Sequence, residues 1–152
     1  MVFPNDILIR IILFILGVCG FFIAKYIYKH KQEGAPLVCP IGFDCHTVVH
    51  SDYSKFMGMR VEILGMVYYA FVSLAYFCLI FIPKALPVPM IAFSVLLSLA
   101  AFIFSIYLIA VQVFILKKGC SWCLVSAAIS VVIFLLITFA SGFFSLIPTL
   151  FQ

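Results

Sequence analysis

Four long runs of apolar residues divide this chain and leave it few ways to fold. They extend over about residues 7–28, 63–82, 89–116 and 120–147. Each is about as long as the roughly 20 residues that a helix needs to cross a bilayer, or longer. Backbone groups in lipid must be hydrogen-bonded within the chain, so runs of this kind form helices. We therefore expect an all-α membrane protein: residues 1–152 form a single transmembrane domain, a bundle of four transmembrane helices.

The composition agrees with a membrane protein and argues against other classes. Hydrophobic residues make up 67% of the chain and charged residues only 9%, far from the mix of a soluble domain. The net charge of +4 is small and scattered, so no nucleic-acid partner is expected. The N-terminus lacks a basic region and a small-residue cleavage site, which indicates that the first run is a retained span rather than a signal peptide.

The loop between the first two runs is the most polar part of the chain and carries two cysteines, Cys39 and Cys45. Asp44 is a suitable N-cap for a short helix over residues 46–57, which Gly58 would close. The apolar residues of that helix share one face. We expect this face to lie on the membrane interface or to cap the bundle.

A second cysteine pair, Cys120-x-x-Cys123, opens the fourth run. This spacing brings both sulfurs to one face of a first helical turn. The helix dipole and the unpaired N–H groups there lower the pKa of a thiol, and the thiolate is the species that attacks a disulfide. The same motif also occurs in structural bridges and zinc sites. On its own it leaves redox chemistry, a static disulfide and half a metal site open.

Four antiparallel spans place both cysteine pairs on one face of the membrane, because the first and third connections share a side. This arrangement permits a relay that passes through a mixed disulfide, most simply between Cys45 and Cys120. The loop pair would meet a protein thiol, and the pair at the helix start would meet an acceptor in the bilayer. No flavin, haem or nicotinamide motif is visible. A lipid-soluble quinone is therefore the acceptor that the architecture best allows.

These features together resemble the vitamin K epoxide reductase family in its short bacterial or archaeal form. The matching positions are Cys39-x5-Cys45, Ser51, Gly58, Gly65 and Cys120-x-x-Cys123. The resemblance implies a four-helix bundle around a pocket for a quinone, menaquinone or ubiquinone. It also implies that Cys39 and Cys45 are the shuttle pair, that Cys120 receives the loop thiol and that Cys123 is the sulfur nearest the quinone. Ser51 would lie near the pocket, unless it only hydrogen-bonds its own backbone.

Two positions depart from the animal enzymes of that family. Ala127 stands where they have a tyrosine, and Val61 where they have an asparagine that contacts a quinone carbonyl. We therefore expect quinone-coupled disulfide formation rather than epoxide reduction. Tyr68, on the second run, is a further candidate for contact with the quinone, with aromatic packing between helices as the alternative. The expected thiol partner is a separate thioredoxin-fold protein, because no such domain is visible at either end.

Two other functions fit the four cysteines of these pairs. The first is a non-enzymatic membrane scaffold with two static disulfides. The second is a four-cysteine zinc site, although the five-residue gap of the first pair exceeds the usual two to four. Cys19 and Cys78 lie inside the spans, where we expect them to act as small apolar side chains.

The orientation in the membrane receives conflicting signals. Basic residues gather on the cysteine side, at Lys25, Lys29, Lys31, Lys55, Arg60, Lys117 and Lys118, against Arg10 and Lys84 on the other. The positive-inside rule would place that side in the cytoplasm. Disulfide formation usually belongs outside it. We expect a multi-pass protein of the cell membrane whose active site faces the extracytoplasmic side, against the charge balance.

Overall fold

A computed structural model of the chain describes residues 5–34, 50, 52, 55–82, 84, 87–117 and 119–140. Three of the candidate site residues, Cys39, Cys45 and Ser51, lie outside these ranges. The same is true of residues 141–147, the predicted end of the fourth run. The expectations about them stay predictions.

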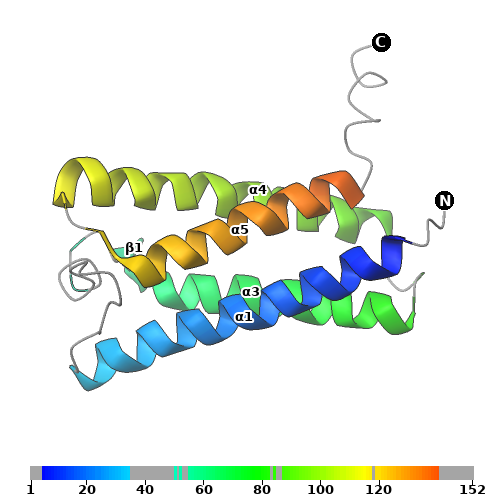
Figure 1. Ribbon diagram of the computed structural model, residues 1–152, viewed down its shortest axis with the longest axis horizontal. Coiled ribbons are helices and arrows are strands. Elements are labelled where there is room, and N and C mark those ends of the chain that lie inside the picture. The colour runs from blue at the N-terminus through cyan, green and yellow to red at the C-terminus, as the bar shows by residue number, and fades with distance from the viewer. Residues whose placement is uncertain are drawn as a thin grey trace, which may run out of the picture.

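Four long helices make up most of the described residues. They are α1 (Asn5–Glu33), α3 (Val61–Phe81), α4 (Val88–Ala110) and α5 (Ser121–Ala140). Consecutive helices run in opposite directions, so the start of α1 and the end of α5 lie at the same end of the bundle (Figure 1). All four, α4 with its continuation, are long and apolar enough to cross a membrane. The predicted all-α bundle of four transmembrane helices is confirmed.

The third span ends in an unusual turn. Helix α4 continues into η2 (Val111–Leu116), a π-helical segment. Lys117 closes it in the left-handed conformation, with φ 51°, and its backbone N–H donates to the carbonyl oxygen of Gln112, five residues earlier. The end of the span at Leu116 was predicted from the basic residues that follow, but the π-helical geometry was not.

Two glycines allow α1 and α3 to approach closely. A Cβ atom added to Gly20 would lie 2.5 Å from the ring of Tyr69, and one added to Gly17 would lie 3.0 Å from the backbone nitrogen of Ser73. The helices are therefore in contact at their backbones and ring faces along this seam. The absence of a side chain at these two positions is what lets α1 approach α3 so closely.

The buried core joins all four helices. Its members are Leu13, Ala24, Tyr68, Tyr69, Val72, Val95, Ile133 and Ile137. Helix α1 packs along α3, and α5 packs against both α4 and α1, whereas α3 and α4 make few contacts with each other. The seam between α3 and α4 is thus much looser than the α1–α3, α4–α5 and α1–α5 seams, and the candidate site opens beside it.

A small hairpin precedes α3, and it corrects one prediction. Strand β1 (Lys55–Phe56) pairs antiparallel with β2 (Met59–Arg60). The short helix predicted over 46–57 is therefore wrong at its C-terminal end. Met57 and Gly58 have φ values of 51° and 82°, and two successive residues with positive φ form the tight reversal of a two-residue hairpin rather than a helix end. The rest of that helix falls outside the described residues, apart from positions 50 and 52.

Candidate functional site

The Cys-x-x-Cys motif lies at the start of α5, at the end of the bundle that carries the hairpin (Figure 1). Cys120 comes just before the helix, and its sulfur accepts a hydrogen bond from the backbone N–H of Cys123 at 3.3 Å. Its carbonyl oxygen accepts the N–H of Leu124 at 2.9 Å. Cys120 therefore acts as a sulfur N-cap of α5. The predicted proximity of the two residues holds, with Cys120 one position outside the first turn.

Gln112 of η2 holds the same turn from the other side. Its side-chain Oε1 accepts the backbone N–H of Cys120 at 3.1 Å, and the residue is only 4% exposed. Cys120 itself has no exposed surface and packs with Ile27 of α1. The sulfur position is thus fixed by α1, η2 and α5 together. Sequence reasoning missed Gln112, although an amide within an apolar run is a signal for a buried polar contact.

These contacts lower the pKa of the Cys120 thiol below its usual value. The largest cause is a hydrogen bond from the side chain of Cys123, and the backbone N–H groups of Cys123 and Trp122 act in the same direction. Burial and the negative charge of Glu62 oppose them. Since the thiolate is the reactive form, the lowered pKa makes Cys120 suited to thiol–disulfide exchange.

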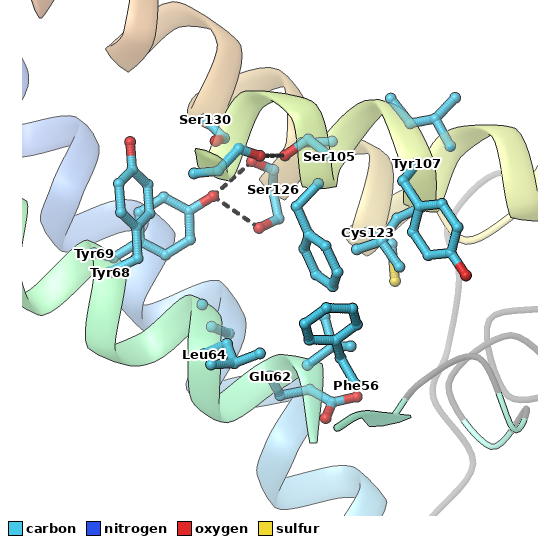
Figure 2. A pocket seen from close by; sticks show the side chains of 18 of the residues that line it. Phe56, Glu62, Leu64, Tyr68, Tyr69, Ser105, Tyr107, Cys123, Ser126 and Ser130 are labelled. Atoms are coloured by element: carbon cyan, nitrogen blue, oxygen red, sulfur yellow. Dashed lines mark hydrogen bonds between the residues drawn. The ribbon is translucent and has the colours of Figure 1, made fainter. Parts of the chain in front are cut away.

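A cavity of about 730 Å³ lies beside the dithiol, and its walls come from all four helices, η2 and the hairpin. Cys123 belongs to its wall, whereas Cys120 does not. Figure 2 shows Cys123 on one side of the cavity, facing the region of Glu62 and Phe56. The wall is mainly apolar, and its polar members are Glu62, Tyr68, Tyr69, Ser105, Tyr107, Gln112, Ser126 and Ser130.

Two tyrosines of α3 form another part of the wall. Tyr68 donates a hydrogen bond to Ser98 Oγ at 3.3 Å. The Tyr69 hydroxyl donates to the carbonyl oxygen of Ser126 at 2.6 Å and lies 2.9 Å from its hydroxyl (Figure 2). Tyr68 therefore lines the cavity and also packs in the core, while its contact with a ligand stays a prediction. Tyr69 and Ser126 were not predicted.

The hairpin reaches the cavity through Phe56. This side chain belongs to the cavity wall and meets the ring of Phe104 edge-on, with 5.2 Å between the ring centroids. The contact joins the hairpin, which precedes α3, to α4 across the loose seam. Phe56 belongs to the apolar face predicted for residues 46–57, which was expected to lie on the membrane interface or to cap the bundle. Its position on the cavity wall fits the second alternative, although its secondary structure was not predicted.

A buried ion pair stands at the same end. Lys31 Nζ lies 3.2 Å from Glu62 Oε1, and both side chains are 8% exposed. Glu62 is also part of the cavity wall. Among the described residues, its second oxygen, Oε2, has no hydrogen-bond partner. Sequence reasoning did not select Glu62, although an acid at the start of a membrane span is a recognised sign of function.

The structure also locates the two other cysteines of the spans and the two positions that differ from the animal enzymes. Cys19 and Cys78 are exposed on the outside of the bundle. Ala127 and Val61, where the animal enzymes have tyrosine and asparagine, are both on the cavity wall. Within the described part of the chain no three metal-ligating side chains gather, and the two loop cysteines lie outside that part.

The comparisons with known proteins agree with this architecture. The model of the vitamin K epoxide reductase family matches residues 11–138, a range that contains all four helices except the ends of α1 and α5. A search of curated proteins found no match. Since the family match covers most of the sequence, the chain belongs to the vitamin K epoxide reductase family and is a membrane oxidoreductase.

Proposed function

We propose that this protein is a quinone-dependent oxidoreductase that generates disulfide bonds. Electrons pass from a thioredoxin-fold thiol protein to Cys39 and Cys45, then to Cys120 and Cys123, and finally to a membrane quinone. The observation that carries the proposal is the position of Cys123 on the wall of an apolar cavity. Its neighbour in the motif is Cys120, whose thiol has a lowered pKa.

The cavity suits a quinone head group in size and chemistry. Its volume of about 730 Å³ lies within the roughly 300–1,000 Å³ typical of ligand pockets. Apolar walls match the ring and its prenyl chain, while a few polar groups match the carbonyl oxygens. Tyr68, Gln112 and Ser130 are the candidates to hold those oxygens. The Ser130 hydroxyl is buried and has no hydrogen-bond partner among the described residues.

The four cysteines carry out the thiol–disulfide exchange in two steps. Once the partner has reduced the loop pair, the Cys45 thiolate attacks the sulfur of Cys120 in the Cys120–Cys123 disulfide and forms a mixed disulfide. Cys123 leaves as a thiolate at the cavity wall and takes up a proton there. Cys39 then attacks Cys45, which restores the loop disulfide and releases Cys120. The lowered pKa of Cys120 makes it a good leaving group in this second step.

Reduction of a quinone in the cavity would reoxidise the dithiol. In this step the Cys120–Cys123 bond forms again, two electrons leave the sulfurs, and two protons reach the quinol. Ser51 is proposed to lie close to this pocket. We further propose that the dithiol faces the extracytoplasmic side, and reporters of membrane topology placed after Gly34 and after Gln152 test that orientation.

The test uses purified protein in lipid nanodiscs with a reduced thioredoxin-fold substrate and a quinone. We expect quinol to form together with an oxidised substrate. Cys123→Ala should abolish quinol formation, because it removes the sulfur on the cavity wall. Cys78→Ala is the matched control, because Cys78 is exposed on the outside of the bundle, and it should keep full activity.

Two results would contradict the proposal. Disulfides that remain intact when quinol is added, with no substrate oxidised, would indicate a static scaffold. One zinc ion per protein, bound by the four cysteines, would indicate the metal-site alternative. Normal quinone reduction by Cys123→Ala would instead reverse the assignment of roles within the pair.

A further inference from the structure

We propose that Glu62, held by Lys31, is a proton-transfer residue between Cys123 and the ligand of the cavity. The inference rests on the proposed function, because it assigns a path to the protons that accompany the electrons. It concerns a residue that neither the motif nor the cysteine relay uses.

Three observations place Glu62 at this point. It lines the same cavity as Cys123, and its charge lies close enough to act on both Cys120 and Cys123. Its side chain is nine-tenths buried, with one oxygen bound to Lys31 at 3.2 Å. Figure 2 shows its carboxylate at the end of the cavity where the Cys123 sulfur and Phe56 also lie.

The second carboxylate oxygen of Glu62, Oε2, points to a role in proton transfer. Oε2 is buried and has no hydrogen-bond partner among the described residues. A buried carboxylate oxygen without a donor is costly, and buried acceptors are normally satisfied. A donor from the cavity would satisfy it: a hydroxyl of the bound ligand, or the S–H of Cys123 when it is not donated to the Cys120 sulfur. Each of these is a group that gives or takes a proton in the reaction.

A gain in stability does not explain well why the Lys31–Glu62 ion pair is buried here. Removing two charges from water costs several kcal/mol per ion, and a buried pair often contributes little net stability. Lys31 fixes one oxygen of Glu62 and so leaves the other available to the cavity. We therefore interpret the pair as an acid–base group, Glu62, that Lys31 holds in position, and not as a contact that stabilises the fold.

Within the part of the chain that the structure describes, the charged and titratable groups around Glu62 come from three elements. Lys31 belongs to α1, and Cys120 and Cys123 belong to the start of α5. Arg60, at the end of β2, directs its guanidinium onto the ring of Tyr28, 5.7 Å from the centroid. Lys31 is thus the cation bonded to the carboxylate, and the two sulfurs are the nearby groups with protons to lose.

The protons balance as follows. Oxidation of the dithiol forms one S–S bond and releases two protons and two electrons, and conversion of a quinone to a quinol consumes the same number of each. The Glu62 carboxylate takes the proton of the Cys123 thiol as that sulfur becomes a thiolate. The carboxylic acid then gives the proton to a ligand oxygen and returns to a carboxylate. The second proton is that of the Cys120 thiol, which passes to water when the thiolate forms, and a proton from water completes the quinol.

Glu62→Gln tests the proposal, since it keeps the shape and removes the proton acceptor. We expect quinone reduction in a single turnover to fall by about tenfold or more, within the range that general acid–base groups contribute. Reduction of the Cys120–Cys123 disulfide by the loop pair should stay within about twofold, as should the equilibrium affinity for quinone. Glu33→Gln is the matched control, because Glu33 is an exposed acid on α1, and it should change none of these quantities.

A measurement without quinone separates proton transfer from a structural role. The charge of Glu62 raises the pKa of the Cys120 thiol, so Glu62→Gln should let the thiolate absorbance of the reduced pair appear at the same pH or lower. The dithiol would then be no worse as a donor, although transfer to quinone is slower. Glu62→Asp, which keeps a carboxyl group, should recover part of the lost rate.

Several outcomes would overturn the inference. They are a wild-type rate of quinone reduction in Glu62→Gln, a loss of rate matched by an equal loss of quinone affinity, or a Glu62→Asp variant no faster than Glu62→Gln. If the unmodified protein reduces no quinone at all, the proposed function has failed instead, and the two failures are distinct.

Discussion

Helix α3 has two unlike faces. Toward α1 it packs so tightly that a Cβ atom at Gly20 would lie 2.5 Å from the ring of Tyr69. Toward α4 it makes few contacts and lines a cavity of about 730 Å³. The same tyrosine serves both faces, because its ring lies on Gly20 while its hydroxyl reaches Ser126 of α5.

The difference shows how a small bundle can keep a large cavity. The close seam between α1 and α3 and the contacts of α5 with its neighbours fix the positions of the helices. The loose seam can then stay open, because its walls do not have to hold the bundle together. We expect substitutions on the tight face to change stability and substitutions on the cavity face to change ligand binding.

The largest effect should come from the tight face. Gly20→Leu would force a bulky side chain against Tyr69 and lower the free energy of unfolding by about 3 kcal/mol, the upper part of the usual range for overpacking. Unfolding in mixed detergent micelles measures it. Cys19→Leu, at the neighbouring exposed position, is the control and should unfold like the unmodified protein. Equal stability of the two variants would show that the seam is not tight.

The next effect belongs to the cavity face. Ala127→Phe would place a ring inside the cavity, one turn after Cys123, and reduce the affinity for quinone by about tenfold or more, or about 1.4 kcal/mol. The unfolding midpoint should change little. Quenching of Trp122 fluorescence measures binding, and Val125→Phe, on an exposed part of α5, is the control. An unchanged affinity would place the quinone elsewhere.

A smaller effect should follow at the residue that joins the two faces. Tyr69→Phe keeps the ring on Gly20 but removes the hydrogen bonds to Ser126. The loss should be about 1 kcal/mol of stability, because the carbonyl and the hydroxyl of Ser126 both lose their tyrosine partner. Tyr107→Phe is a suitable control, because Tyr107 is about half exposed. If Tyr69→Phe is as stable as the unmodified protein, the hydrogen bonds between Tyr69 and Ser126 do not contribute to the stability of the bundle.

The smallest effect is a shift in the pH dependence of the thiol–disulfide exchange rate of Cys120. The pKa of Cys120 lies below its usual value, chiefly through the hydrogen bond from the side chain of Cys123. Its thiolate therefore persists to lower pH than that of an ordinary thiol, and its exchange rate rises with pH through the lowered pKa and is flat above it. Cys123→Ala removes the main cause and should move this rise to higher pH. An unmoved profile, followed by reaction with a small disulfide reagent, would contradict the assigned cause.

The sequence was sufficient for the parts of the molecule that follow from regular patterns. Four apolar runs predicted four spans, all of which the structure contains. The Cys-x-x-Cys motif predicted a sulfur pair at a helix start. Each of these depends on local periodicity or on a fixed spacing, so the tertiary structure had little to add.

The other parts depend on contacts between distant segments. The hairpin was missed because the apolar residues of 46–57 fit a helical face, while Met57 adopts a positive φ that a residue with a Cβ rarely takes. Gln112 and Glu62 are polar residues within or at the edge of apolar runs. The sequence marks them as unusual, but only the fold reveals that one holds Cys120 and the other pairs with Lys31.

The most direct test isolates the dithiol at the cavity. A variant in which Cys39 and Cys45 are both replaced by serine is reduced, freed of reductant and mixed anaerobically with excess quinone in nanodiscs. The account predicts one quinol per protein and, by mass spectrometry, a new Cys120–Cys123 disulfide. If the pair stays reduced and no quinol forms, while the unmodified protein makes quinol, electrons do not leave through Cys123 and the account is wrong.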